Sequence, residues 1–162
     1  MAIKVFVEIP KGSKNKYELD KKTKRIILDR TLYGCEVFPF EYGFIEGTLG
    51  EDGDPLDAVL LASSPTFPGC IVEAEAIGYL DMEDESGIDH KVIAVPAEKI
   101  DPRWSHVKDV DDLTEAQKAE IKNFFETYKL LEPGKWVKIK EFNSKEEAEK
   151  IIGEAFKRND HS

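Results

Sequence analysis

Apolar and polar residues alternate over the first ten positions of the chain. Ile3, Val5, Val7 and Ile9 fall on one face of an extended segment, and the residues between them fall on the other. A period of two is typical of a half-buried strand. Pro10 ends the pattern, because proline has no amide hydrogen to donate to a sheet. The sequence therefore predicts a strand at this point.

Short extended segments continue through the first hundred residues. The predicted strands lie at 16–19 and 25–30 around a turn at 20–24, at 57–62, and at 69–80 and 91–97 around the acidic segment 81–90. The run at 57–62 is apolar after its first residue, as expected for a strand covered on both faces. Pro39 and Gly43 break the aromatic segment 37–45 into bends. Because strands follow one another without alternating helices, the pattern favours a small barrel over a doubly wound sheet.

Helical periodicity is confined to the last third of the chain. Thr114 and Gln117 have capping-box spacing, and Ser144 and Glu147 repeat it. The apolar residues that follow on one helix face are Ile121, Phe124, Phe125 and Tyr128 after the first box, and Ala148, Ile151, Ile152, Ala155 and Phe156 after the second. The sequence therefore predicts a mixed α+β chain, mainly β, with two C-terminal helices. It has no repeat, low-complexity tract or linker, which favours one domain over residues 1–162.

The composition narrows the class of protein. Of the 162 residues, 41% are hydrophobic and 10% are aromatic, so the chain has enough apolar residues to form a core. The net charge of −10, from 33 acids and 23 bases, argues against nucleic acid or an anionic membrane as a partner. Cys35 and Cys70 lack metal-site spacing and are expected as reduced, partly buried thiols. With no signal-peptide core and no apolar run of membrane length, we expect a soluble, cytoplasmic protein.

Four acids occur within seven positions in the segment EDGDPLD, directly before the apolar run. Two carboxylates about 4 Å apart repel by about 1 kcal/mol in water and about 4 kcal/mol at an effective dielectric near 20. A solvated turn is one interpretation, because Asp and Gly favour turns. An EF-hand beginning at Asp52 does not fit, because its sixth and twelfth positions hold Asp57 and Ser63 where Gly and Glu are required.

A magnesium site is the third interpretation of this segment. Asp52 and Asp54 leave the same face of an extended chain, and carboxylates on such a frame hold hard cations that keep several waters. The segment DMEDESGIDHK adds Asp84 and Asp89 on a predicted hairpin, although an exposed polar hairpin remains an alternative there. A cavity for several metal ions would draw on the first cluster, Asp52, Asp54 and Asp57, on Asp84 and Asp89, and on the acid pair Glu8 and Glu18.

A phosphate substrate also requires cationic and hydroxyl donors. The candidates are Lys16, Arg30, Tyr42, Lys91, Tyr128 and Lys129. Lys16 and Glu18 share one face of their predicted strand, which places a cation beside an acid as a metal–phosphate site requires. Tyr128 continues the apolar face of the first predicted helix, so a core tyrosine with a solvated hydroxyl is the alternative interpretation.

Six segments of the chain together resemble the soluble family I inorganic pyrophosphatases of the short bacterial type. They are VEIPKGSKNKYELD, LDR, YGFI, DGDPLDAVLL, FPGCIVEAEAIGYLDMEDESGIDHKVIAVP and FFETYKLLEPGKWVKI, and the likeness runs in order from about Val5 to Phe156. The resemblance implies a closed five-stranded barrel of the oligonucleotide-binding (OB) type with two helices packed outside. It also implies hydrolysis of pyrophosphate to two phosphates with several magnesium ions, the nucleophile being a hydroxide that bridges two of them.

The resemblance also implies roles for individual residues. The ligands of the activating metals are expected to be Asp52, Asp57 and Asp89, and those of metals that arrive with the substrate Asp84, Asp89, Glu8 and Glu18. Asp57 is expected to bridge two metals. The phosphate ligands are expected to be Lys16, Arg30, Tyr42, Lys91, Tyr128 and Lys129. Asp54 is the first choice for the residue that accepts the proton of the nucleophilic water, and Asp89 is the second, because a metal ligand is less free to take a proton.

The resemblance leaves some features of the protein open. Phe38 stands where many bacterial members have Tyr, so one hydroxyl that could touch the site is missing. Relatives are commonly hexamers built from two trimers, and we expect the same here. Calcium, which is larger and accepts looser geometry than magnesium, is expected to inhibit. Two other functions stay open: a cation-binding or regulatory protein without catalysis, and a phosphatase that acts on nucleotides or phosphoesters.

Overall fold

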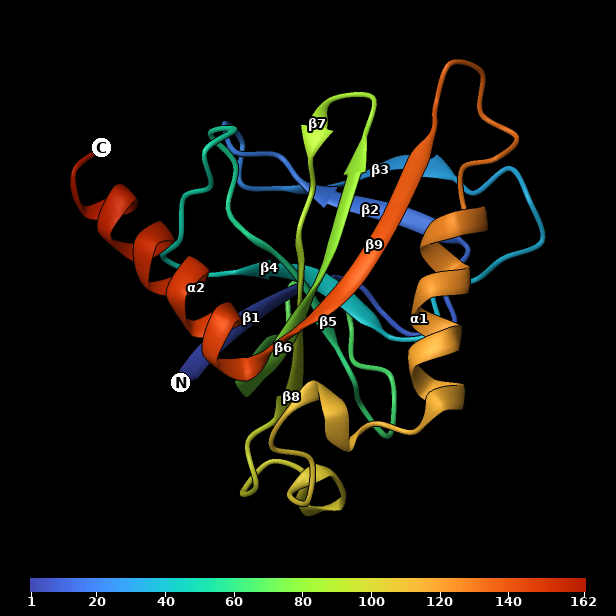
Figure 1. Cartoon of the computed structure of the whole chain (residues 1–162). Helices are drawn as coiled ribbons and strands as arrows, with labels where there is room; N and C mark the ends of the chain where they lie inside the picture. The colour runs from blue at the N-terminus through green and yellow to red at the C-terminus, as the bar shows by residue number, and fades with distance from the viewer.

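The computed structural model describes residues 1–162 and has a closed five-stranded barrel at its centre (Figure 1). The barrel strands are β1 (Ala2–Ile9), β4 (Glu41–Ile45), β5 (Asp57–Leu60), β8 (Lys91–Pro96) and β6 (Ile71–Asp84). They pair in the order β1–β4–β5–β8–β6, and β6 pairs back with β1 to close the sheet. Only β5 and β8 are parallel, while the other barrel pairs are antiparallel. The predicted small barrel is confirmed.

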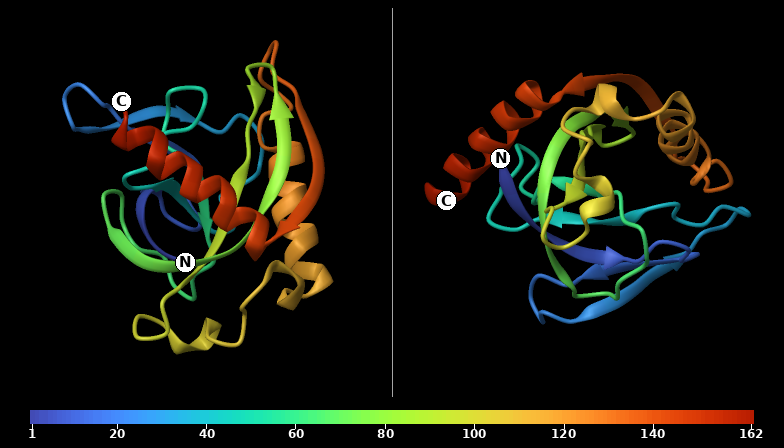
Figure 2. Two further views of the ribbon diagram at one scale, coloured as in Figure 1. Left: turned by 60° about the vertical axis from the view of Figure 1, so that its left-hand side comes forward. Right: turned by 90° about the horizontal axis from the view of Figure 1, so that it is seen from below.

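The remaining elements lie around the barrel. They are the hairpin of β2 (Asn15–Leu19) and β3 (Ile26–Thr31), the short β7 (Gly87–Ile88), two 3₁₀ turns (Pro102–Trp104 and Val110–Asp112), α1 (Glu115–Thr127), β9 (Val137–Ser144) and α2 (Lys145–Asp160). The two helices flank the barrel, and β9 runs between them along β6 (Figure 2). The β2–β3 hairpin lies at the same end of the molecule as the turn between β6 and β7 (Figure 1).

Strand β9 is the one long element that the sequence analysis did not predict. Val137 and Ile139 alternate with lysines there, so the period of two was present in the sequence. The strand pairs with the second half of β6, from Gly78 to Asp84. This pairing requires the unusual length of β6, fourteen residues, whose first half is already bonded to β1.

Both helices begin where the capping patterns predicted. The Thr114 hydroxyl accepts from the Gln117 amide, and the Gln117 side chain accepts from the Thr114 amide, so the first box is complete. The Ser144 hydroxyl accepts from the Glu147 amide, but the reciprocal bond is absent. Ser144 is also the last residue of β9, so the second helix starts directly from the sheet with half of a capping box.

Strands β5 and β8 are buried on both faces, as predicted for the apolar run. Val59 and Ile93 belong to a core that includes the α1 aromatics Phe124 and Phe125. The residues on the other face belong to a second core that includes Ile152 of α2: Ala58, Leu60, Val92 and Ala94. Alternate residues of β5 and β8 therefore belong to different cores, one of which includes residues of α1 and the other a residue of α2.

Strands β1 and β4 approach each other closely at Gly43, in the YGFI segment. A Cβ at this position would lie 1.8 Å from the carbonyl oxygen of Phe6, so no side chain fits. The predicted bend at Gly43 is therefore wrong: the glycine lies within β4, where this contact leaves no room for a side chain.

Cys35 and Cys70 are both free thiols. The expectation of partial burial is confirmed for Cys70 and wrong for Cys35, which is exposed in the loop between β3 and β4. In α1 and α2 the apolar stretches are too short and too often interrupted by charges to cross a bilayer.

Candidate active site

Charged side chains gather at the end of the barrel where β5 and β8 begin. Because these strands are parallel and in register, their first residues, Asp57 and Lys91, lie opposite each other. Asp89 comes two residues before Lys91 and lies between the end of β7 and the start of β8. The register of the sheet therefore brings together acids from segments about thirty residues apart.

Lys91 lies at the centre of this cluster, with its side chain only 4% exposed. Its ammonium nitrogen lies 2.7 Å from the Tyr42 hydroxyl, 2.8 Å from Asp57 Oδ2 and 2.9 Å from the Asp89 carboxylate. Burial lowers the pKa of Lys91, but Asp57 and the other neighbours raise it well above its usual value. Lys91 is therefore a fixed positive charge between two acids.

The two tyrosines of the cluster are kept in their neutral form. Burial is the main cause that raises the pKa of Tyr42 well above its usual value, and Asp57 adds to this rise. Burial also raises the pKa of Tyr128, although the positive charges of Lys91 and Lys129 oppose this rise. The ring of Tyr128 stacks on Phe124 at 5.1 Å, so the ring belongs to the core. The Tyr42 hydroxyl accepts from Lys91, and both hydroxyls keep a proton that they can donate.

Glu8, at the end of β1, connects the barrel with the β2–β3 hairpin. Its carboxylate accepts from the Leu19 amide at 2.9 Å. Burial raises the pKa of Glu8 to about 7, and the nearby charges of Asp57 and Glu18 add to the rise. The Leu19 amide and Lys16 oppose this rise, and a metal cation beside Glu8 would lower the pKa further.

A second lysine forms ion pairs with the acidic turn between β6 and β7. Lys129 lies 3.2 Å from Asp84 and 3.2 Å from Glu85, and its side chain is buried. Burial alone would raise the pKa of Asp84, but the Ser86 amide and Lys129 lower it below its usual value. The loop after α1 is thereby held against the end of β6.

The β2–β3 hairpin contributes two cations on one face. Lys16 and Arg30 lie opposite each other across the two strands. Both contact Asp29, Lys16 at 3.4 Å and Arg30 at 2.5 Å. Arg30 also lies 2.7 Å from Glu132, a buried acid in the loop after α1.

The loop from Glu51 to Asp57 is the most exposed part of the site. The Asp52 carboxylate accepts from the Asp54 amide at 3.0 Å, and Gly53 has a φ of +88°, which other residues rarely adopt. Asp54 forms an ion pair with Lys21, and both side chains are 61% exposed. The loop therefore combines a fixed backbone with freely hydrated carboxylates.

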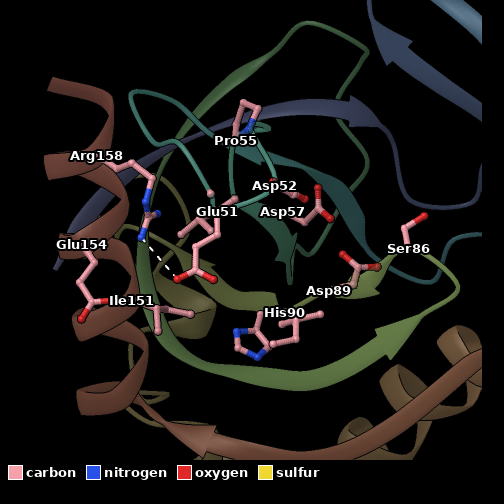
Figure 3. A pocket seen from close by; sticks show the side chains of 13 residues that line it. Glu51, Asp52, Pro55, Asp57, Ser86, Asp89, His90, Ile151, Glu154 and Arg158 are labelled. Carbon is pink, nitrogen blue, oxygen red and sulfur yellow. Dashed lines mark ion pairs between the residues drawn. The ribbon is translucent and has the colours of Figure 1, made fainter. Parts of the chain in front are cut away.

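Helix α2 anchors this loop from the far end of the chain. The Leu49 amide donates to the Ala155 carbonyl at 3.0 Å, and Arg158 donates to the Leu49 carbonyl at 2.7 Å. Figure 3 shows Arg158 reaching from the helix toward Glu51, 3.9 Å away. The residues between helix and loop line a cavity of about 410 Å³ that includes Asp52, Asp57 and Asp89 (Figure 3).

The structure thus brings nearly all predicted site residues to one end of the barrel. Exposed Asp54 and Glu18 lie at its margin. No three acidic, histidine or cysteine side chains are spaced closely enough to hold a metal ion as they stand. The donor set nonetheless fits a hard cation, because it consists of carboxylate oxygens. Burial, Asp57 and Glu18 together raise the pKa of Glu8 despite the nearby Lys16, and a bound cation would stabilise its carboxylate form.

Sequence reasoning missed the residues that hold the predicted ligands in place. Four of them contact a predicted ligand directly: Lys21, Asp29, Glu85 and Glu132. Asp29 and Glu85 are sequence neighbours of Arg30 and Asp84, which was a usable signal. Glu132 is a single acid in a loop, and no pattern pointed to it.

Comparison with known proteins identifies the family. The profile of the inorganic pyrophosphatase family matches residues 5–160. The chain belongs to this family. The inorganic pyrophosphatase of Helicobacter pylori is 52% identical over 153 residues, which are 94% of this chain and 88% of that protein. That of Nanoarchaeum equitans is 50% identical over 155 residues, 96% of each chain.

Solved structures of pyrophosphatases have the same fold. The structure of the Helicobacter pylori pyrophosphatase superposes with a TM-score of 0.96 at 50% identity, covering 98% of this chain and 94% of that one. The Thermus thermophilus pyrophosphatase gives a TM-score of 0.95 at 45% identity, covering 98% and 91%. Membership of the pyrophosphatase family confirms the prediction of an enzyme, a diphosphatase, and implies a metal cofactor.

Phe38, which stands where many bacterial members have Tyr, lies in the core. The centroid of its ring is 4.6 Å from that of Phe124.

Proposed function

We propose that this protein hydrolyses inorganic pyrophosphate to two phosphates with several magnesium ions. The observation that carries the proposal is the convergence of two opposite sets of charge at one end of the barrel. Carboxylates for metals come from β1, the loop before β5 and the β6–β8 segment, and cations for phosphate come from β3, β8 and the loop after α1. A protein that only stores cations has no use for the second set.

The proposed metal ligands form two groups that differ in their position in the site. Asp52, Asp57 and Asp89 line the cavity beside α2 and would hold the activating ions, with Asp57 shared between two of them. Glu8, Glu18 and Asp84, together with Asp89, would bind ions that enter with the substrate. Magnesium, when bound, supplies charge neutralisation and lowers the pKa of coordinated water from 15.7 toward neutrality, which is the source of the expected hydroxide nucleophile.

The cations and hydroxyls would bind the phosphates. Lys91 and Tyr42 are already fixed to each other, and Tyr128 presents a neutral hydroxyl in the same region. Lys16 and Arg30 approach from the hairpin and Lys129 from the loop after α1. Donors held in place before the substrate arrives stabilise developing negative charge without reorganising during the reaction. Asp54 would accept the proton of the attacking water, because its carboxylate is hydrated and bound only to an exposed lysine.

The direct test is phosphate release from three substrates: pyrophosphate, ATP and p-nitrophenyl phosphate. We expect rapid release from pyrophosphate with magnesium, and little release from the other two or after addition of EDTA. Equal rates on ATP or p-nitrophenyl phosphate would favour the phosphatase alternative. Magnesium binding without any phosphate release would favour a cation-binding or regulatory role.

Calcium should inhibit the magnesium-loaded enzyme. Calcium accepts 6 to 8 oxygen ligands in loose geometry, so it can occupy these carboxylates without holding the reacting groups in line. The measurement is the rate of pyrophosphate hydrolysis in fixed magnesium as calcium is added. Equal turnover with either ion alone would show that coordination geometry does not limit the reaction.

A homohexamer in the cytoplasm is part of the same proposal, and it rests on the likeness to bacterial pyrophosphatases. Sizing by light scattering at micromolar concentration tests the assembly. A single monomer peak would contradict the hexamer and leave the proposed reaction unaffected.

A further inference from the structure

Glu132 is a buried acid outside the set of predicted site residues. It lies in the loop between α1 and β9, and its side chain is only 6% exposed. A carboxylate this buried is costly unless it is paired. We therefore expect the ion pair of Glu132 to have a definite role in the protein.

The partner of Glu132 is the guanidinium of Arg30. Glu132 Oε1 lies 2.7 Å from Arg30 Nε, and Glu132 Oε2 is buried without a hydrogen-bond partner. The two groups therefore form a close ion pair. Asp29 lies 2.5 Å from Arg30 Nη1. Two carboxylates thus hold two of the three guanidinium nitrogens, and Nη2 makes no hydrogen bond or ion pair within the protein.

The ion pair joins two parts of the molecule that share no sheet. The β2–β3 hairpin is a separate two-stranded sheet and makes no strand pairing with the barrel. Glu132 belongs to the same loop as Lys129, and the Glu132 amide donates to the Lys129 carbonyl at 3.1 Å. The contact between Arg30 and Glu132 therefore sets the spacing between a cation on the hairpin and a cation on the loop.

We infer that Glu132 is a positioning residue for pyrophosphate binding, which it serves by fixing the guanidinium of Arg30 relative to Lys129. This inference rests on the proposed function, in which both cations bind phosphate. A diphosphate has two charged ends at a fixed separation, so the spacing of the cations decides whether both ends are bound together. Glu132 itself does not touch the substrate, because a carboxylate would repel it.

The first test is Glu132→Gln, which keeps the size of the side chain and removes its charge. We expect kcat/KM for magnesium pyrophosphate to fall by about 10- to 100-fold, the range for losing a charged contact. Glu132→Asp keeps the charge but shortens the side chain by one methylene, and its loss should be intermediate. The matched control is Glu73→Gln, which breaks an ion pair of the same 2.7 Å length with Lys99 outside the site. This control should leave kcat/KM unchanged.

The second test separates positioning from a structural role. In an Arg30→Lys background, which lacks Nε, Glu132→Gln should lower kcat/KM by no more than about twofold further. Full additivity of the two losses would overturn the inference, because Glu132 would then act elsewhere. A fall in thermal stability with unchanged kcat/KM for Glu132→Gln would also overturn it.

The third test does not need turnover. Affinity for inorganic phosphate with magnesium present, measured by calorimetry, should weaken in Glu132→Gln and in Arg30→Lys by similar factors. If the unaltered protein releases no phosphate from pyrophosphate, the proposed function fails, and this binding measurement still decides the inference. If Arg30→Lys weakens phosphate binding and Glu132→Gln does not, the inference fails and the proposed function stands.

Discussion

Asp54 and Asp89 are carboxylates of the same kind, but their surroundings differ. Asp54 lies in the loop before β5, with its side chain 61% exposed and bound to an equally exposed lysine. Asp89 lies next to β8, with its side chain 22% exposed and 2.9 Å from the buried ammonium of Lys91. Burial raises the pKa of Asp89 and Asp57 adds to the rise, while Lys91 opposes it.

The difference between the two residues bears on which one is the base. A general base needs an oxygen free to accept a proton, and a ligand needs a fixed position. Asp54 has the first property and Asp89 the second. The comparison therefore favours Asp54 as the base and Asp89 as a ligand, and substitutions at these residues test this assignment.

The largest expected effect is that of Asp54→Asn on the maximum rate. The amide cannot accept the proton, and loss of a general base typically costs about 10²- to 10⁴-fold. Excess magnesium should not restore the rate, whereas a higher pH should restore part of it by supplying hydroxide. The measurement is rate against magnesium concentration over a pH series.

The matched variants for this test are Asp57→Asn and Asp89→Asn. Both should weaken magnesium binding and regain part of their rate in excess magnesium. If Asp54→Asn is rescued by metal and Asp57→Asn is not, the two roles are reversed. A metal-independent loss in Asp89→Asn would identify Asp89 as the base.

Next in size is the effect of Lys91→Met on the stability of the metal-free protein. The substitution leaves Asp57 and Asp89 close together without their buried cation. Breaking a buried pair from one side costs about 3 to 5 kcal/mol, and the partial exposure of Asp57 favours about 3. Denaturant unfolding in EDTA measures the loss. Magnesium should reduce it, and a loss that magnesium does not change would contradict this charge argument.

The pH dependence of stability in EDTA should depend on Glu8. Because the pKa of Glu8 is raised from 4.5 to about 7, its contribution to stability is fully present below pH 4.5 and is lost as the pH rises through 7. The loss corresponds to at most about 3 kcal/mol. Glu8→Gln should therefore be more stable than the unaltered protein at pH 8 by more than at pH 5. An equal difference at both pH values would show that the pKa of Glu8 is not raised in the folded protein.

The smallest effect is expected for Lys21→Met, the counterpart of Lys91→Met on the exposed acid. Exposed ion pairs contribute about 0 to 1 kcal/mol, and both partners here are well exposed. Unfolding in denaturant should change by less than about 1 kcal/mol. A loss as large as that of Lys91→Met would show that the loop before β5 is not hydrated as the structure indicates.

Elements whose pattern depends only on residues near one another in the chain could be predicted from the sequence. The alternation of β1, the apolar run of β5 and the first capping box led to correct elements, because each depends on residues near one another in the chain. The same alternation exists in β9, but the lysines between its apolar residues weaken the signal. Cys35 was expected to be partly buried from its residue type, and the exposure of its loop depends on packing that residue type does not encode.

The candidate site could be predicted as a set of residues but not as an arrangement. The contact of Asp57 with Lys91 depends on the parallel register of β5 and β8, which no local pattern reveals. The pairing of Arg30 with Glu132 joins two elements about a hundred residues apart. The sequence could suggest what kind of chemistry is present, whereas the supporting contacts required the folded chain.

The anchoring of the acidic loop by α2 has a consequence for the timing of synthesis. The bond from Arg158 to Leu49 spans 109 positions of the chain. At roughly 5 to 20 residues per second, a ribosome needs roughly 5 to 20 seconds to make this stretch. Throughout that interval the segment with Asp52 and Asp54 has left the ribosome without its anchor. A nascent chain should therefore complete the proposed magnesium site only when the last turns of α2 have emerged.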